Sequence, residues 1–590
     1  AGMLPAPAVG LAVLIRRPAT VLRWRLLLAC MVALAAGVTP FATQPIRAAY
    51  FPAVNEGEPT ACRTKLELKC TLSKATYDVF MYNFNRGQYG KPALTQRQAS
   101  FGEQIGMWWL YFRWQWFRDV DQQSQFTQSL LAATFLALGL AGAMVHYKRD
   151  RKSFWYFGTL MFTMTLLLIY YLNFKLGASQ GGAPDAEHEV RDRDYFFLWS
   201  YSAWGVWAAL GLVYVWEAIA ELAAASRPSA ERGAGLGVRS WAVASPIALL
   251  AIVPLFANCT TAPRAKHTST RNMAADLLNS VEPYGVLVTV GDNDTFPLWY
   301  AQEVEGVRRD VVVANTSLLN TDWYARQLIR RPIYDYDEAK GPAIYRGKQW
   351  AKPSTVPLHM TFDEADRVPE YFELPKPMMF TAKGFSTTVD PRRLQYGVLQ
   401  RADVLVLHMI QDAWPERPIY FARSAVGYPR SLGLENHMLI QGLASKLFLP
   451  PTSPAAAKDT VFVQGDGWFD ITRSEELWKQ VFDGPKAIVA EGRWVDRPSV
   501  SMPAMYVFAG AELADALKST GRSSDAQVVL AKAKQVAKAT QLDELMRGID
   551  QAARPESAGD SVTSVPLRLN ADSQPKVQTT APTARGPRKP

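Results

Sequence analysis

The sequence has few of the residues that build metal, nucleotide and disulfide sites. Its 590 residues include only 4 cysteines and 6 histidines. No His-x-x-x-His or Cys-x-x-Cys pair occurs, and neither does a Walker A loop or a Gly-x-Ser-x-Gly elbow. These absences argue against a disulfide scaffold, a zinc enzyme, a P-loop nucleotidase and an α/β-hydrolase.

Charged residues are also sparse, at 20%, whereas hydrophobic residues make up 48%. This composition excludes a disordered or collagen-like chain. The net charge of +10 is explained by membrane orientation and a basic tail, and it predicts no nucleic-acid partner. The mean hydropathy of −0.08 averages an apolar half, up to about residue 257, and a half with the pattern of a soluble protein.

Long apolar runs dominate the first half, which we interpret as a transmembrane domain over residues 1–258. A helix needs about 20 mostly apolar residues to cross a bilayer. The runs at 126–145, 154–174, 195–216 and 241–257 meet this need, and 22–41 does so if Arg23 and Arg25 snorkel to the interface. A shorter run at 3–15 fits the remnant of a further helix better than a signal peptide. The sequence therefore predicts five or six spans.

Basic residues orient these spans. They gather in alternate connections, at 16–25, 146–152 and 227–239, which belong in the cytoplasm by the positive-inside rule. The outer loop 43–125 and everything after residue 258 then lie outside, in the periplasm of a bacterial inner membrane. Cys62 and Cys70 share that loop, and an oxidising compartment would allow them to pair.

The outer loop contains an aromatic segment at 107–117, with seven aromatic residues among eleven. Such a segment is typical of a helix lying at the level of the lipid headgroups, with Arg113 and Arg118 directed toward phosphates. Two interpretations remain open. The segment is either an aromatic belt without a ligand or the resting place of a lipid-linked substrate.

After residue 259 the pattern changes to that of an extracytoplasmic α/β domain, over 259–500. Short continuous apolar runs alternate with amphipathic segments, which indicates a small parallel sheet with helical connections. The expected strands are 285–290, 311–314 and 419–422, and the expected helices are 271–280, a segment ending near 305, one beginning near 321, and 404–414.

Polar residues follow the first two strands. The candidate substrate-binding residues are Asp292, Asn293, Asp294, Asn320, Asp322 and Trp323. Ligands of parallel sheets bind beyond the carboxyl ends of the strands. Two carboxylates two residues apart suit the hydroxyls of a sugar or a divalent cation. The alternative is structural: Asp294 or Thr295, and Thr321 or Asp322, would cap the helices that follow.

The C-terminal part is predicted to hold a helical hairpin, over 501–551, with small residues where tetratricopeptide repeats carry them. Residues 552–590 are rich in Pro, Ser, Thr and basic residues without periodicity, and we predict a disordered tail.

Several strings together resemble one bacterial membrane family. They are Thr-Pro-Phe-Ala-Thr-Gln-Pro-Ile-Arg-Ala-Ala at 39–49, Asn-Glu-Gly-Glu-Pro at 55–59, Phe-Asn-Arg-Gly-Gln-Tyr-Gly at 84–90, Arg-Asp-Arg-Asp-Tyr-Phe at 191–196, Gly-Asp-Asn-Asp-Thr-Phe-Pro-Leu-Trp-Tyr at 291–300 and Ser-Leu-Leu-Asn-Thr-Asp-Trp-Tyr at 317–324. The family is known as domain of unknown function 2723, and its members look like protein O-mannosyltransferases. The resemblance runs from about residue 26 to 425.

The resemblance implies a glycosyltransferase of the GT-C architecture. Such an enzyme moves a mannose-like sugar from a polyprenyl-phosphate carrier to a protein acceptor at the outer face. The transfer needs a carboxylate base and cations that hold the departing phosphate. The family pattern carries the acidic residue in the first outer loop, which we expect to be missing from this chain, since the chain resembles the C-terminal part.

Three arginines are the candidates for the carrier phosphate: Arg47, Arg191 and Arg193. Arg47 has an alternative role as an interfacial anchor, and the other two as partners of neighbouring acids. Glu56 and Glu58 are either acids of the site or solvated loop residues. The competing hypothesis for the whole chain is a non-catalytic, membrane-anchored subunit that binds glycan or protein. A transporter fits less well, because the four clear spans carry no charge at their centres.

Overall fold

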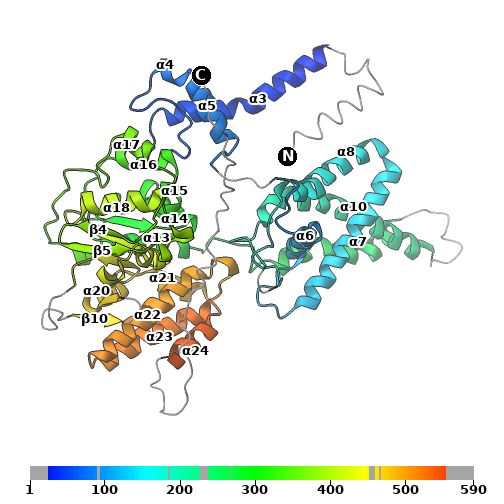
Figure 1. Ribbon diagram of the computed structural model, residues 1–590. Coiled ribbons are helices and arrows are strands. Elements are labelled where there is room, and N and C mark those ends of the chain that lie inside the picture. The colour runs from blue at the N-terminus through cyan, green and yellow to red at the C-terminus, as the bar shows by residue number, and fades with distance from the viewer. Residues whose placement is uncertain are drawn as a thin grey trace.

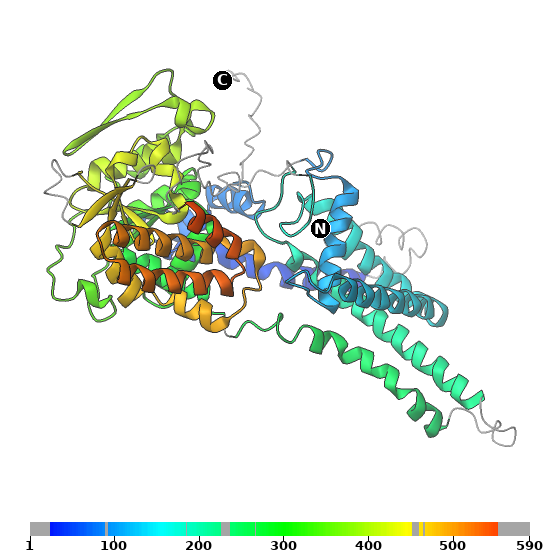
Figure 2. The same cartoon turned by 90° about the horizontal axis from the view of Figure 1, so that it is seen from below.

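The computed structural model describes residues 24–88, 93–183, 186–225, 237–265, 267–450, 459–463 and 467–552. The short apolar run at 3–15 and residues 553–590 of the tail lie outside the described residues. Helices α7 (Gln125–Arg149), α8 (Arg151–Phe162) and α10 (Leu198–Ala225) gather at one end of the molecule, and a sheet with its covering helices forms the other (Figures 1 and 2). Helix α3 (Trp24–Ala48) lies apart from the first group, beside α5 (Lys74–Phe84) (Figure 1).

Among the described residues, five helical segments are long and apolar enough to cross a membrane, and each overlaps one of the expected runs. They are Leu27–Ala48 within α3 (Trp24–Ala48), Gln125–Arg149 (α7), Arg151–Leu172 (α8, Arg151–Phe162, to α9, Leu168–Leu172), Asp194–Ala225 (ending in α10, Leu198–Ala225) and Val238–Ala257 (α11, Val238–Ala244, to α12, Val253–Ala257).

Helices α7 and α10 pack closely because glycines let their backbones approach. A Cβ on Gly142 would lie 1.8 Å from the carbonyl oxygen of Trp207, and one on Gly211 would lie 1.9 Å from that of Leu138. Small residues at a crossing of this kind are typical of helices that associate by close backbone packing. The two glycines therefore set the spacing of this helix pair.

The aromatic segment forms helix α6 (Phe101–Trp116), which begins with a capping box between Ser100 and Glu103. One face of α6 is buried with residues of α7 and α10 in a shared aromatic core. Trp116 stacks on Phe135 of α7 with ring centroids 4.1 Å apart. The segment is thus packed against the apolar helices, in addition to any role at headgroup level.

The second half is built on a seven-stranded sheet of order β10-β11-β8-β9-β7-β1-β2. Two of its strands, β9 and β10, run antiparallel to the rest, so the sheet is mixed rather than purely parallel. The strands are β1 (Val286–Thr289), β2 (Val312–Asn315), β7 (Ile419–Ala422), β8 (Met438–Gln441), β9 (Ala444–Leu447), β10 (Thr460–Val463) and β11 (Gly467–Asp470).

Helices cover both faces of the sheet, because successive side chains of a strand point to opposite faces. Leu287 of β1 lies in one hydrophobic core, whereas Val286 and Val288 lie in the other. Figure 1 shows α22 (Ser501–Ser519) and α23 (Ser523–Ala539) on one side and α16 (Asp322–Arg330) and α18 (Arg401–Ala413) on the other. The main covering helices are α13 (Ser269–Ser280), α14 (Asp292–Glu303), α20 (Ile471–Glu476), α21 (Gly484–Glu491), α16 (Asp322–Arg330) and α18 (Arg401–Ala413).

The expected hairpin is present as α22 (Ser501–Ser519) and α23 (Ser523–Ala539), and a further helix, α24 (Asp543–Ala552), follows it. These helices share one hydrophobic core with the sheet. The hairpin is therefore part of the same packed body as the α/β elements, and its small residues serve that packing. Residues 334–377 are largely irregular, with short α17 (Phe362–Arg367) and β3 (Tyr371–Glu373).

The outer loop folds onto the sheet end of the molecule. A disulfide joins Cys62 to Cys70, which lies within α4 (Leu68–Thr71), and α5 (Lys74–Phe84) follows. Glu58 is only 4% exposed. It accepts hydrogen bonds from Arg326 at 2.8 Å and Arg330 at 2.7 Å, both on α16. Glu58 is therefore a buried anchor, which corrects the interpretation that it is a solvated loop residue.

Candidate functional site

Three parallel strands, β1, β2 and β7, end at the same edge of the sheet. The chain passes from β1 through α14 to β2 on one side, and only later returns to the other side of β1 as β7. This reversal makes the point between β1 and β7 a topological switch point, where ligands of α/β sheets bind. The residues that follow β1 and β7 are therefore the candidate site.

Asp294 lies in the first turn of α14 and is only 8% exposed. Ser424, just after β7, donates a hydrogen bond to Oδ2, and Thr295 donates one to Oδ1 at 3.3 Å. Burial raises the pKa of Asp294, while the hydrogen bond from Ser424 opposes that rise. The result is a carboxyl group held between β1 and β7 that gains a proton more readily than a free aspartate.

The capping alternative is not met by side-chain hydrogen bonds, although Thr321 does take the N-cap position of α16. The residue that precedes α14 is Gly291, and no side chain caps this helix. The N-cap of α16 is Thr321, and its side chain makes no capping hydrogen bond either. Asp294 is instead turned toward Ser424 because β7 ends beside β1.

Hydroxyl and amide groups fix the backbone around Asp294. The hydroxyls of Thr289 and Thr295 are 2.7 Å apart. Asn315, at the end of β2, donates from Nδ2 to the carbonyl oxygen of Gly291 at 2.9 Å and to Oγ1 of Thr295 at 2.7 Å. Ser317 donates to the carbonyl oxygen of Val290 at 2.6 Å. The loop after β1 is thus tied to the next strand and held in one conformation.

Asp292 and Asn293 are exposed at the outer surface of this loop. Arg191, 101 residues earlier in the chain, places a guanidinium nitrogen 3.5 Å from Oδ2 of Asp292. Both side chains are about half exposed, at 49% and 48%. A pair of this length and exposure is weak. Arg191, predicted to bind phosphate, therefore contacts Asp292, predicted to bind sugar. The contact is too weak to hold either side chain in one conformation.

The other two predicted phosphate ligands do not reach this place. Arg193 donates to Oε2 of Glu189 at 2.9 Å and to the hydroxyl of Tyr195 at 3.1 Å. The partner acid is Glu189, which lies outside the alternating stretch 191–194, so Arg193 pairs with an acid other than the ones expected. Arg47 is exposed in the last turn of α3.

Asn320, Asp322 and Trp323 serve other contacts. Asn320 accepts from the backbone N–H of Ala402 at 3.0 Å, and Asp322 pairs with Arg401, so both hold α18. Trp323 is buried and donates from its indole nitrogen to Oε1 of Gln88 in the outer loop, at 3.0 Å. Within the described ranges, none of the three has a hydrogen bond or ion pair with Asp292, Asn293 or Asp294.

The predicted cation has no ready ligand set in the part of the chain that the structure describes. No group of three or more His, Cys, Asp or Glu side chains could hold a metal ion there. Asp292 and Asp294 are directed to different partners, Arg191 and Ser424. The edge therefore suits hydroxyl and phosphate groups better than a metal.

Sequence reasoning missed the contribution of the strand β7. Arg423 and Ser424 follow it directly, in the same place that Val290 and Gly291 take after β1. Ser424 binds Asp294, and Arg423 pairs with Glu512 of α22. The signal was available, because β7 was itself an expected strand and its carboxyl end had to lie at this edge.

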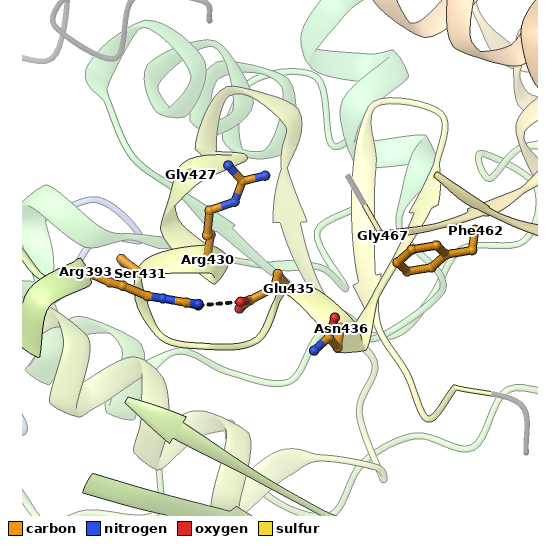
Figure 3. A pocket seen from close by; sticks show the side chains of 8 residues that line it. All are labelled: Arg393, Gly427, Arg430, Ser431, Glu435, Asn436, Phe462 and Gly467. Atoms are coloured by element: carbon orange, nitrogen blue, oxygen red, sulfur yellow. Dashed lines mark hydrogen bonds and ion pairs between the residues drawn. The ribbon is translucent and has the colours of Figure 1, made fainter. Parts of the chain in front are cut away.

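A hollow of about 510 Å³ lies elsewhere on the domain (Figure 3). Figure 3 shows Arg393 paired with Glu435, facing Asn436 and Phe462 across the opening. None of its lining residues is a residue that the sequence predicted for a site. We do not include this hollow in the candidate site, because none of the polar side chains just after β1 or β2, and neither Arg423 nor Ser424 after β7, lines it.

Comparison with known proteins gives one match. A family model described as TMEM260-associated domain 2 matches residues 270–390. This stretch runs from α13 through β1, α14, β2 and α16, and it includes the loop that carries Asp292 and Asp294. No curated protein and no solved structure matches the chain.

Proposed function

We propose that the chain is a membrane-embedded glycosyltransferase of the GT-C type that uses a polyprenyl-phosphate sugar and modifies protein at the outer face of the bacterial inner membrane. In this proposal the edge formed by β1 and β7 recognises sugar hydroxyls. Arg191 faces the phosphate of the carrier, and the resemblance to the family of unknown function 2723 supplies the reaction.

Two observations support the proposed orientation in the membrane: the position of the basic connection between α7 and α8, and the contacts of the loops at the other ends of the apolar helices. Basic residues fill the connection between α7 and α8, which the positive-inside rule assigns to the cytoplasm. The loops at the opposite ends of the apolar helices all contact the sheet end of the molecule, through Glu58–Arg326, Asp121–Arg493 and Arg191–Asp292. A single outer compartment accounts for all three contacts, and the Cys62–Cys70 disulfide suits an oxidising one.

The observation that carries the proposal is the contact between Arg191 and Asp292. The loop of Arg191 leads directly into a candidate span that begins at Asp194, so its guanidinium is near the expected membrane surface. Asp292 lies at the switch point of the sheet. Because the pair is half exposed and 3.5 Å long, a phosphate can take the place of Asp292 as the partner of Arg191, leaving the carboxylate to accept from a sugar hydroxyl.

The test is transfer of labelled mannose from polyprenyl-phosphate mannose to membrane protein, with the full chain in vesicles of its source membrane, where an acidic base from outside this chain can be supplied. Arg191→Gln and Asp292→Asn should each lower transfer at subsaturating donor by about tenfold, the loss expected for one hydrogen bond to a charged group. Arg271→Gln is the matched control, since Arg271, on α13, is 47% exposed and pairs with Glu305 at 2.8 Å. Equal transfer by all variants would refute a role for this edge.

A second candidate, a non-catalytic subunit that binds glycan, is favoured by one feature. Both oxygens of Asp294 already accept hydrogen bonds from Ser424 and Thr295, so this buried carboxyl is not free to deprotonate an acceptor. Binding of mannosides that is lost in Asp292→Asn, in a chain that moves no sugar from any polyprenyl phosphate, would select this candidate over the enzyme.

A further inference from the structure

A second hollow, of about 460 Å³, lies at the amino ends of β1 and β7, opposite the candidate site. Tyr284 comes two residues before β1 and Pro418 comes directly before β7, and both line it. Lys446 and Leu447, at the end of antiparallel β9, line it as well. The candidate site follows the carboxyl ends of the same strands, so the two places are separate. We call the second place the aromatic hollow.

Four aromatic side chains line the aromatic hollow: Tyr284, Trp350, Trp414 and Phe448. Three of them rest edge-on against a ring that does not line the hollow. The pairs and their centroid distances are Trp350–Tyr345 at 5.6 Å, Trp414–Phe385 at 5.4 Å and Phe448–Trp468 at 6.1 Å. Packing behind the lining rings therefore holds them in place without a ligand.

Tyr284 is held in a backbone conformation that is rare for tyrosine. Its φ of 63° lies in the left-handed region. The backbone N–H of Tyr284 donates to Oδ2 of Asp310 at 3.0 Å, and its carbonyl oxygen accepts from Nε of Arg417 at 2.9 Å. Both partners are buried. Strain of this kind persists only where surrounding contacts fix it, and it is typical of ligand sites. Two buried charged residues thus set the position of this ring.

Polar groups of the aromatic hollow retain hydrogen-bonding capacity. Glu416 is exposed and accepts from the backbone N–H and the hydroxyl of Ser354, at 3.3 and 3.4 Å, through Oε1 only. Within the described ranges, Oε2 of Glu416 accepts no hydrogen bond, and the side-chain N–H groups of Gln349 and Trp414 donate none. The hollow therefore offers a ligand a carboxylate oxygen, an amide and an indole N–H.

The charges of the aromatic hollow disfavour an anionic ligand. Both oxygens of Glu282 accept from Nζ of Lys446 at 2.7 Å, so this pair is neutral overall. Glu416 is the other charged side chain among the described residues that line the hollow. A phosphate or carboxylate would therefore meet a negative charge. A purely apolar ligand also fits poorly, because it would cover the Glu416 carboxylate without giving it a hydrogen bond.

We propose that the aromatic hollow binds a neutral oligosaccharide. Sugar hydroxyls both donate and accept hydrogen bonds, as Glu416 and Gln349 require, and the C–H groups of a sugar ring pack on aromatic faces such as that of Trp350. A proline-rich peptide, another ligand of aromatic-lined grooves, fits less well because proline has no N–H for Glu416. The volume lies within the ~300–1,000 Å³ of small-molecule sites. This site requires neither the membrane placement nor the sugar transfer proposed above.

The test measures binding of neutral oligosaccharides of glucose, mannose, galactose and N-acetylglucosamine to the full chain, in a detergent without a sugar headgroup. We expect at least one of them to bind. Glu416→Gln should weaken that binding about tenfold and Gln349→Ala about fivefold, because each removes hydrogen bonds to hydroxyls. Both side chains are exposed, so neither change threatens the fold. Trp350→Ala, which removes an aromatic face, should weaken binding about tenfold or more.

Glu338→Gln is the matched control and should bind like wild type. Glu338 is also exposed and accepts from a backbone N–H, that of Gly347 at 2.6 Å, but it does not line the hollow. Asp292→Asn should bind normally too, which separates this site from the candidate site. Binding lost in Asp292→Asn but kept in Glu416→Gln and Gln349→Ala would overturn the proposal. Wild-type protein that binds none of these sugars, or only a polyproline peptide, would overturn it as well.

Discussion

At the scale of single residues, Asp276 ties the C-terminal helices to the sheet. This buried side chain of α13 accepts from the backbone N–H groups of Asp483 at 3.1 Å and Gly484 at 2.8 Å, where α21 begins. It also accepts from the hydroxyl of Tyr506 on α22 at 2.7 Å. Burial raises its pKa to about 6, despite these hydrogen bonds.

Because folding raises the pKa of Asp276, the direction in which its contribution to stability changes with pH is determined. The folded state binds the proton of Asp276 more tightly than the unfolded state does, so this group stabilises the fold fully below pH ~4, and that contribution is lost as the pH rises through about 6. Between pH 5 and pH 7 the loss is about 1 kcal/mol.

Asp276→Asn should remove that part of the pH dependence. The measurement is the thermal unfolding of the full chain in detergent at pH 5 and pH 7, compared between wild type and variant. Asp515→Asn is the control, because Asp515 is half exposed and pairs with Lys518 at 3.1 Å. The same pH dependence in wild type and Asp276→Asn would contradict the account of this carboxyl.

At the scale of elements, the packing of α7 against α10 depends on glycines. Gly211→Ala should lower the unfolding temperature in detergent, because its Cβ would lie 1.9 Å from the carbonyl oxygen of Leu138. Overpacking of this kind costs about 1–3 kcal/mol. Gly205→Ala in the same helix is the matched control, since its Cβ would meet nothing within 4 Å. An equal effect of the two substitutions would show that the crossing is not set by Gly211.

The apolar elements were predictable, because their signal is local. The runs at 126–145 and 195–216 lie within observed helices, and the expected strand 419–422 coincides with β7. In each case the length of the continuous apolar run indicates the element: a long run predicts a membrane-spanning helix, and a short run predicts a buried strand. Strand β9 was missed because Ala444–Leu447 contains a serine and a lysine and lacks the apolar run of a buried strand.

Contacts between distant segments could not be predicted in the same way. The sequence marked Arg191 and Asp292 separately, and nothing local indicates that they meet across 101 residues. The fate of Asp322 likewise depends on where α18 packs, since Arg401 is its partner. Ser424 is a partial exception. The sequence predicts the end of β7, which Ser424 follows, but it does not predict that β7 lies beside β1 in the sheet.

At the scale of the whole molecule, the outer loop and the sheet domain are joined by buried charges. Glu58→Gln should loosen the outer loop from α16, because it removes the carboxylate that Arg326 and Arg330 share at a site only 4% exposed, and leaves Arg326 with Asp366 alone. Breaking a buried pair by losing one member costs about 3–5 kcal/mol. Hydrogen exchange of the backbone around Glu58 should therefore rise strongly.

The control for this change is Glu67→Gln in the same loop. Glu67 pairs with Lys65 at 3.1 Å, and both side chains are well exposed. Exposed pairs contribute about 0–1 kcal/mol, so exchange around Glu58 should stay unchanged in this variant. Unchanged exchange in Glu58→Gln as well would mean that the outer loop is held to the sheet domain by other contacts.

The central claim is that a membrane-bound sugar carrier meets the sheet edge at the outer face. The most direct measurement offers the full chain in vesicles either polyprenyl-phosphate mannose or a nucleotide-activated mannose, and follows labelled sugar into protein. The account predicts transfer from the lipid donor alone, reduced by Asp292→Asn. Transfer from the nucleotide donor, or transfer from the lipid donor that Asp292→Asn leaves unchanged, would contradict it.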